Sequence, residues 1–175
     1  EEGEFEPALV ELDLAVRHAD LGGYGVMLAL ALSNRGEVLT KLGRLDEART
    51  DLTTAVDLLQ RQGSSLVAYP TSALVRLFVA RGDIEQARGA GERALALGEA
   101  VGDRQITAAT HVQLAHALAS REPDTARHHA EQAVAATSSL DLAEAWWVAA
   151  KLALDRGDRA AAADAVSRSI ELART

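Results

Sequence analysis

The hexapeptide GRLDEA at residues 43–48 recurs in altered form along the chain and decides the fold. Its relatives are GEFEPA (3–8), GDIEQA (82–87), REPDTA (121–126) and GDRAAA (157–162). The alanines that end the five segments recur at a nearly constant interval, at positions 8, 48, 87, 126 and 162, and a small residue follows seven positions after each. Self-similarity at a period of this length is typical of repeat proteins, in which each repeat is one supersecondary unit.

Each complete repeat reads as two helices joined by a tight turn. In the first complete repeat the apolar residues after the turn share one helical face, at Ala48, Leu52, Ala55, Val56 and Leu59. Glycine, which adopts left-handed backbone without steric cost, stands where the preceding helix must end, at Gly43, Gly82 and Gly157. No stretch alternates apolar and polar residues between hairpin turns, so we expect no β-sheet.

Helix starts are marked as well. Asp83 and Asp158 can cap the helices that follow them, and Asp83 with Gln86 has the spacing of a capping box. Pro123 suits a first helical position. Pro70 favours a helix that begins near Tyr69, because a helix beginning at residue 65 would be kinked by it.

Composition excludes several classes of protein. The chain has 175 residues and no cysteine, so it has no disulfide framework and no thiol nucleophile. Its 18 basic and 26 acidic residues give a net charge of −8, which disfavours nonspecific binding to nucleic acid or anionic membrane. No apolar run approaches the roughly 20 residues of a membrane span, and no signal peptide opens the chain. We therefore expect a cytoplasmic protein.

The repeat pattern resembles the tetratricopeptide repeat, W-x2-L-G-x2-Y followed by A-x3-F and a further small residue. The 32–55 copy carries it as Leu32, Arg35, Gly36, Leu39, Ala48, Leu52 and Ala55. The positions of the family's first small residue and central alanine keep one spacing in every complete copy, at 36 and 48, 75 and 87, 114 and 126, and 150 and 162. The periods exceed the roughly 34 residues usual for the family, and no copy ends with its closing proline.

This resemblance implies an all-α fold, a right-handed α-solenoid of about nine helices in antiparallel hairpins. As one domain over residues 1–175, it would contain the second helix of a truncated repeat (1–20) and four full repeats (25–61, 66–101, 103–137 and 140–174). The intervening turns are expected at 21–25, 62–65, 98–103 and 137–141. Because the chain opens with Glu1 inside a repeat, we expect it to be part of a longer protein.

Repeats of this greater length resemble the helical sensor arms of large bacterial NTPase-coupled transcription regulators, including LuxR-type regulators. The phrases KLGRLDEAR (41–49) and ALALGEAVGDR (94–104) are similar to those arms. The resemblance implies a role in transcription regulation for the parent protein. It also implies that any DNA-binding module lies outside these residues.

The sequence offers no candidate catalytic site. The five histidines, at 18, 111, 116, 128 and 129, form no H-x3-H or HExxH pattern that would build a zinc site. Residues 22–25 lack the lysine of a phosphate-binding loop, and no serine stands in a GxSxG elbow. Arginines are scattered without a basic stripe. We therefore expect no enzyme activity, cofactor, metal or direct nucleic-acid contact.

A stack of helical hairpins presents its first helices on the concave side. Transfer of the family's peptide-contact positions predicts that a partner contacts Ser33, Glu37, Tyr69, Ser72, Arg76, His111, Trp147 and Lys151. Trp147 either projects into this groove, since its neighbour occupies the family's buried Trp position, or packs under the following helix. The lysine and asparagine that clamp a C-terminal carboxylate in some members are missing.

Two functions of different class follow from this surface. The first is a noncatalytic scaffold that binds a protein, a peptide or another domain of the parent chain. The second is a sensor arm that holds a small-molecule inducer. We also expect apolar edges at Leu9, Leu12 and Val16, and at Ile170 and Leu172, through which an isolated chain could form a homodimer.

Overall fold

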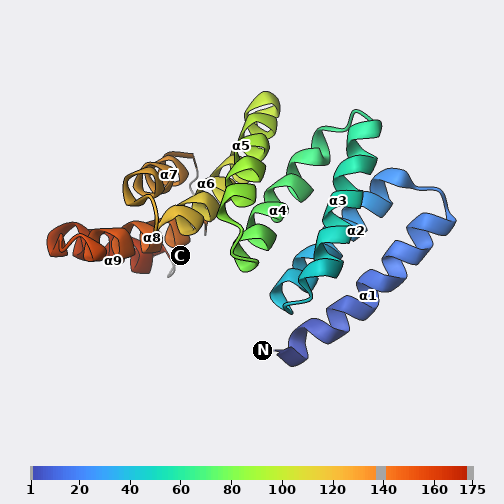
Figure 1. The fold of residues 1–175 in the computed structure, drawn as a ribbon, viewed down its shortest axis with the longest axis horizontal. Coiled ribbons are helices and arrows are strands. Elements are labelled where there is room, and N and C mark those ends of the chain that lie inside the picture. The colour runs from blue at the N-terminus through green and yellow to red at the C-terminus, as the bar shows by residue number, and fades with distance from the viewer. Residues whose placement is uncertain (1, 137–140, 173–175) are drawn as a thin grey trace. The chain divides into compact units, whose positions relative to one another are not determined.

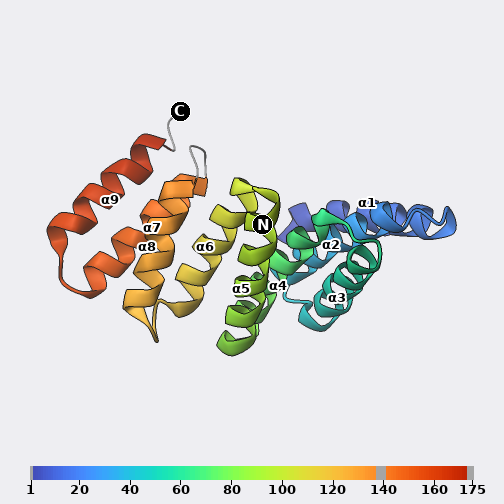
Figure 2. The same ribbon diagram turned by 90° about the horizontal axis from the view of Figure 1, so that it is seen from above.

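The computed structural model describes residues 2–136 and 141–172, and all regular structure in these ranges is helical (Figure 1). The helices succeed one another through short turns, as antiparallel hairpins do (Figure 2). The all-α solenoid that the repeat predicted is therefore confirmed.

The chain divides within helix α5 into two compact units, Glu1–Arg93 and Ala94–Thr175. The first, unit 1, contains α1 (Glu2–Leu21), α2 (Gly25–Lys41), α3 (Leu45–Arg61), the short 3-10 helix η1 (Ser65–Val67), α4 (Ala68–Ala80) and the first part of α5 (Ile84–Val101). The second, unit 2, contains the rest of α5, α6 (Arg104–Leu118), α7 (Pro123–Ala136), α8 (Asp141–Asp155) and α9 (Arg159–Leu172). The expected turn at 137–141 lies mostly outside the described residues.

The turns inside the hairpins have the predicted glycine chemistry. Gly43 has φ 74°, and Gly82 and Gly157 adopt the same left-handed conformation. At the end of α2 the N–H of Gly43 donates to the carbonyl of Thr40, and the N–H of Arg44 donates to the carbonyl of Leu39. This pair of bonds is the Schellman motif, which satisfies the last carbonyls of a helix and requires a residue such as glycine at its centre.

The predicted helix starts are also confirmed. The carboxylate of Asp83 accepts from the backbone N–H of Gln86 and from its side-chain amide, and Asp158 accepts from the N–H of Ala161. Pro123 is the first residue of α7. Pro70 lies in the first turn of α4, where its missing N–H costs no helical hydrogen bond, and η1 covers the preceding residues.

In unit 1, α2 packs closely on α3, and α1 packs on α2. The hairpin contact that the repeat predicted between Leu39 and Leu52 is buried. Gly36 allows the two helices to approach, because a Cβ atom at this position would stand 2.7 Å from Cγ of Leu52. The family's small-residue position is therefore set here by steric contact.

In unit 2, α6 packs on α7, α8 packs on α9, and α8 also contacts α6 and α7. Ala117 and Ala130, which the repeat places opposite one another in the α6–α7 hairpin, are both buried. The core between these helices combines such alanines with a few larger side chains, Leu114, Leu118, Val148 and Leu152. Small residues at these positions suit closely packed helices.

One expectation about apolar edges is wrong. Leu9 is only 7% exposed, and Leu12 and Val16 are half-buried, because the stripe they form packs toward α2. The exposed apolar side chains of α1 lie on its opposite face. Ile170 of α9 is exposed as expected, and the side chain of Leu172 lies outside the described residues.

None of the helices in the described ranges combines the length and the apolarity that crossing a lipid bilayer requires.

Candidate functional site

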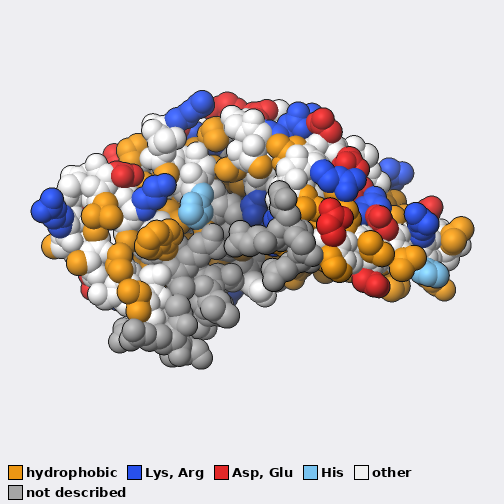
Figure 3. Space-filling model, turned by 90° about the horizontal axis from the view of Figure 1, so that it is seen from below, with side chains coloured by type: hydrophobic (Ala, Val, Ile, Leu, Met, Phe, Trp, Pro, Cys, Tyr) orange, Lys and Arg blue, Asp and Glu red, His pale blue; other side chains and the backbone are white. Residues whose placement is uncertain are grey.

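In unit 1 the first helices of two repeats, α2 and α4, pack against each other and bring together two predicted contact residues. Nη2 of Arg76 on α4 lies 2.8 Å from Oε2 of Glu37 on α2. Tyr69 precedes Arg76 by about two turns of α4, and its side chain is exposed. Glu37, Tyr69 and Arg76 are named here the α2–α4 face, and Figure 3 shows mixed charges on part of the unit 1 surface.

Two other predicted contact residues of unit 1 lie beneath this surface. Ser33 on α2 and Ser72 on α4 occupy equivalent positions in successive repeats, and both are buried. A small hydroxyl side chain at this position lets adjacent helices pack closely. In this arrangement Ser33 and Ser72 offer little surface, so contact of a partner with their side chains stays a prediction.

In unit 2 the two tryptophans of the chain stand side by side on α8 in different surroundings. Trp147 is 57% exposed, so it is not packed under the following helix. Lys151 is also exposed and follows Trp147 by one helical turn. Trp146 is half-buried, and the guanidinium of Arg168 on α9 lies 4.9 Å from the centre of its ring, within the range of a cation–π interaction.

His111, the remaining predicted contact residue, belongs to a pair that sequence reasoning missed. It is only 8% exposed, and its Nδ1 lies 2.9 Å from Nδ1 of His129 on α7. Burial, together with the nearby rings of His129 and His128, lowers the pKa of His111 to about 4. His111 is therefore neutral near pH 7, and one Nδ1 of the pair donates while the other accepts.

The repeat register held the signal for this pair. His111 stands two repeat periods after Ser33, and His129 stands the same distance after Asp51. Equivalent positions in repeats have equivalent surroundings. Attention to histidines within single helices hid the pairing, because the two rings come from the two helices of one hairpin.

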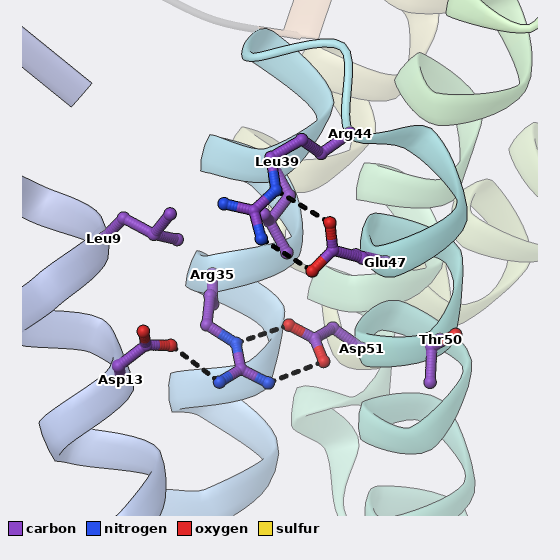
Figure 4. Close-up of a pocket in the computed structure, with 8 residues that line it drawn as sticks. All are labelled: Leu9, Asp13, Arg35, Leu39, Arg44, Glu47, Thr50 and Asp51. Carbon is purple, nitrogen blue, oxygen red and sulfur yellow. Dashed lines mark hydrogen bonds and ion pairs between the residues drawn. The ribbon is translucent and has the colours of Figure 1, made fainter. Parts of the chain in front are cut away.

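A cavity of about 330 Å³ between α1, α2 and α3 was also not predicted (Figure 4). Its centre is Arg35, which lies between Asp51 of α3 and Asp13 of α1. Nε and Nη2 of Arg35 donate to Asp51 at 2.6 and 2.8 Å, and Nη1 donates to Asp13 at 2.8 Å. The hydrogen bond to Asp51, assisted by the one to Asp13, raises the pKa of Arg35 further above its ordinary value.

At the rim of the cavity Arg44 and Glu47 form a second, exposed pair. Nε and Nη2 of Arg44 donate to the carboxylate of Glu47 at 2.7 and 2.6 Å. These hydrogen bonds raise the pKa of Arg44 and lower the pKa of Glu47. Each of these two arginines is therefore neutralised by carboxylates of the same unit, and the arrangement joins helices more readily than it attracts an anionic ligand.

Within the described ranges, no three or more histidine, aspartate or glutamate side chains converge closely enough to hold a metal ion. The ionisable groups described above form hydrogen-bonded pairs between helices. They do not converge on a common open cleft in the way that acid–base catalysis requires.

Comparison with known proteins identifies the architecture. The crystal structure of BtubC (BKLC) from P. vanneervenii is similar, with a TM-score of 0.78 and 20% sequence identity, and the match covers 99% of this chain and 74% of that one. No curated protein sequence matches the chain. Residues 27–100 match the family model of the tetratricopeptide repeat.

The family match covers α2 to α5, the stretch with the close α2–α3 hairpin and the Glu37–Arg76 pair. The similar crystal structure has the same fold over nearly the whole length of this chain. From residue 27 to residue 100, this chain is built of repeats that belong to the tetratricopeptide family.

Proposed function

We propose that the chain is a noncatalytic protein-interaction module that binds a peptide or a helix of a partner protein on the first helices of its repeats. Tetratricopeptide repeats generally mediate protein–protein interaction, which supports this class of function. The binding residues in this proposal are the exposed members of the predicted set. They are Glu37, Tyr69 and Arg76 in unit 1, and Trp147 and Lys151 in unit 2.

The ion pair between Glu37 and Arg76 is the observation that carries the proposal. It places opposite charges from two successive repeats on one exposed face, 2.8 Å apart. Such a pair offers both hydrogen-bond donors and acceptors to a ligand that lies across α2 and α4. Tyr69 adds an aromatic side chain with a polar tip, a residue type that is enriched where proteins meet partners.

Trp147 supplies the corresponding anchor in unit 2. More than half of its surface faces solvent, although tryptophan is highly buried on average in folded proteins. Burial of such a ring in a partner's pocket is among the largest single contributions to binding. Lys151 one turn away favours a ligand with an acidic group beside an apolar side chain. Each unit thus suits an amphipathic segment that carries charge.

Selection of a random peptide library on the immobilised chain tests the proposal. The dissociation constants of selected peptides are then measured by calorimetry for the wild-type chain and for Arg76→Ala, Trp147→Ala and the double variant. We expect each single replacement to weaken binding about tenfold in the unit it affects, as loss of an anchor side chain does. Arg61→Ala, on the exposed end of α3, is the matched control.

The groove proposal fails if selected peptides bind the double variant as tightly as the wild-type chain. A small molecule that binds at Trp147 while no peptide is selected would favour the sensor function instead. Circular dichroism of each variant confirms that the helices are intact.

The wider context in this proposal is a cytoplasmic bacterial regulator of which the repeats form one arm. It rests on the phrases at residues 41–49 and 94–104 and on the cysteine-free composition. The reading frame that contains this chain tests it directly. A nucleotide-binding loop or a DNA-binding helix-turn-helix in the same frame is expected, and a frame without either would remove the regulator context while leaving the interaction module intact.

A further inference from the structure

Helix α1 is apolar on two opposite faces. One face, with Leu9 at its centre, packs toward α2 and is buried. On the other, Val10, Leu14 and Leu21 are 58%, 45% and 87% exposed. A helix that only covers a core has charged or polar residues on its outer side, so this second apolar stripe is not explained by the packing of unit 1.

Two opposite charges accompany the exposed stripe. With about 100° of rotation per residue, Glu6, Val10, Leu14, Arg17 and Leu21 fall within an arc of about 80° on α1. Glu6 and Arg17 are exposed, and they lie at the acidic and basic ends of the stripe. They are separated by about 16 Å along the helix, so they do not pair with each other within one chain.

We infer that this face, formed by Glu6, Val10, Leu14, Arg17 and Leu21 and named here the outer α1 face, pairs antiparallel with the same face of a second copy of the chain. The residues are arranged about position 12: Val10 and Leu14 stand at equal distances to either side of it, and Glu6 and Arg17 stand at nearly equal distances further out. A two-fold axis at this level therefore sets Val10 against the partner's Leu14, and Glu6 against the partner's Arg17.

The same pattern selects the orientation. In a parallel pair Glu6 would meet the partner's Glu6, and Arg17 would meet the partner's Arg17, so both ends would carry like charges. The antiparallel pair makes two opposite-charge contacts and two apolar contacts, because each contact occurs twice in an isologous interface. The charge order along α1 is thus complementary to itself only when one copy is reversed.

The expected dimer is weak. One pair of helices of this length buries less surface than the ~1,600 Å² of a standard stable interface, so association is expected at roughly 10 µM to 1 mM chain. Tyr24 and Met27, which follow α1 and are also exposed, extend the apolar surface beyond Leu21. Sedimentation equilibrium over this concentration range measures the dissociation constant of the wild-type chain.

A charge exchange tests the pairing. Glu6→Arg alone and Arg17→Glu alone each create like-charge contacts at both ends of the dimer, and we expect each to weaken it at least fivefold. The double variant restores opposite charges at both ends and is expected to return to within twofold of the wild-type constant. Arg61→Glu makes the same charge change on an exposed site of α3 and should leave the constant unchanged.

Engineered cysteines test the register, because the chain contains none of its own. A mixture of Val10→Cys and Leu14→Cys chains is expected to form an oxidised cross-link faster than either variant alone. The inference is overturned if the wild-type chain stays monomeric at about 1 mM, the upper end of the expected range, or if it dimerises but the charge exchange shows no rescue. It is also overturned if the mixed cross-link is no faster. Unchanged circular dichroism of the variants excludes unfolding as the cause.

Discussion

Arg35 and Asp51 are joined by two parallel hydrogen bonds, from Nε to Oδ2 at 2.6 Å and from Nη2 to Oδ1 at 2.8 Å. The same guanidinium also donates to Asp13. Arg35 therefore links the two helices of its own hairpin, α2 and α3, to the preceding helix α1. A contact of this kind holds successive repeats in one register, on which the stability of a repeat array depends.

Replacement of Arg35 should destabilise unit 1. In Arg35→Met the carboxylate of Asp51, which is 8% exposed, loses both charged donors, and we expect the free energy of unfolding to fall by about 2 kcal/mol. Asp51→Asn should cost more than Asp13→Asn, because the side chain of Asp13 is 45% exposed and water can replace its partner. Urea unfolding followed by circular dichroism measures these differences. Equal costs for the two aspartates would contradict the bridging role of Arg35.

The His111–His129 pair should make unit 2 sensitive to acid. The pKa of His111 is about 4 in the folded chain and near its ordinary value of 6.5 when unfolded. Between these values the unfolded state binds a proton that the folded state does not, so this contribution to stability is complete above pH 6.5 and is lost as the pH falls toward 4.

Comparison of the wild-type chain with His111→Gln isolates this term. We expect the wild-type chain to lose on the order of 2 kcal/mol more stability than the variant between about pH 7 and about pH 4.5, because only the wild-type chain has His111 to titrate. His18→Gln, at an exposed position on α1, is the control and should follow the wild-type curve. Parallel curves for His111→Gln and the wild-type chain would show that burial of His111 does not couple folding to pH.

Two glycines inside helices should respond in opposite ways to alanine. Gly36→Ala would place a Cβ atom 2.7 Å from Cγ of Leu52 and 3.3 Å from the carbonyl oxygen of Ala48, and it should destabilise the chain by about 1–3 kcal/mol. At Gly89 no heavy atom lies within 4 Å of the added Cβ. Gly89→Ala should therefore stabilise the chain by about 0.5–1 kcal/mol, since alanine is the better helix former.

Thermal unfolding of the two variants measures these effects. Both contain the same chemical change within a helix, so each serves as the other's control. A stabilising Gly36→Ala would show that α2 and α3 do not meet as closely as the structure shows.

The neighbouring tryptophans should separate stability from binding. Trp147→Ala removes an exposed ring, and we expect a change of less than about 0.5 kcal/mol in unfolding free energy. Trp146→Ala removes a half-buried ring that lies beneath Arg168, and it should cost about 1–2 kcal/mol more. Because these are the two tryptophans of the chain, fluorescence quenching by acrylamide of each single-tryptophan variant checks their exposure. Similar quenching of both would contradict the difference in burial.

Much of the fold follows from local sequence signals. The glycines that end helices, the aspartates that cap them and the alanine that recurs in each repeat all act through neighbouring backbone or through one helical face. Such effects depend on a few adjacent residues, so the helices and their turns could be predicted without knowledge of distant contacts. Glu37 and Arg76 were also predicted on one surface, because the repeat period carries one position onto the next helix.

Burial and side-chain pairing depended on tertiary structure. Whether Ser33 and His111 face a partner or lie beneath the surface depends on how closely neighbouring helices pack. The three-helix contacts of Arg35 need groups at positions 13 and 51, which no local pattern joins.

The two apolar faces of α1 show the same division. Its sequence determined that the helix forms and that apolar residues lie on both sides, because helical periodicity assigns each residue to a face. Only the packing of α2 against Leu9 decided which side is buried, since that contact joins residues from separate helices and leaves Val10 and Leu14 facing solvent.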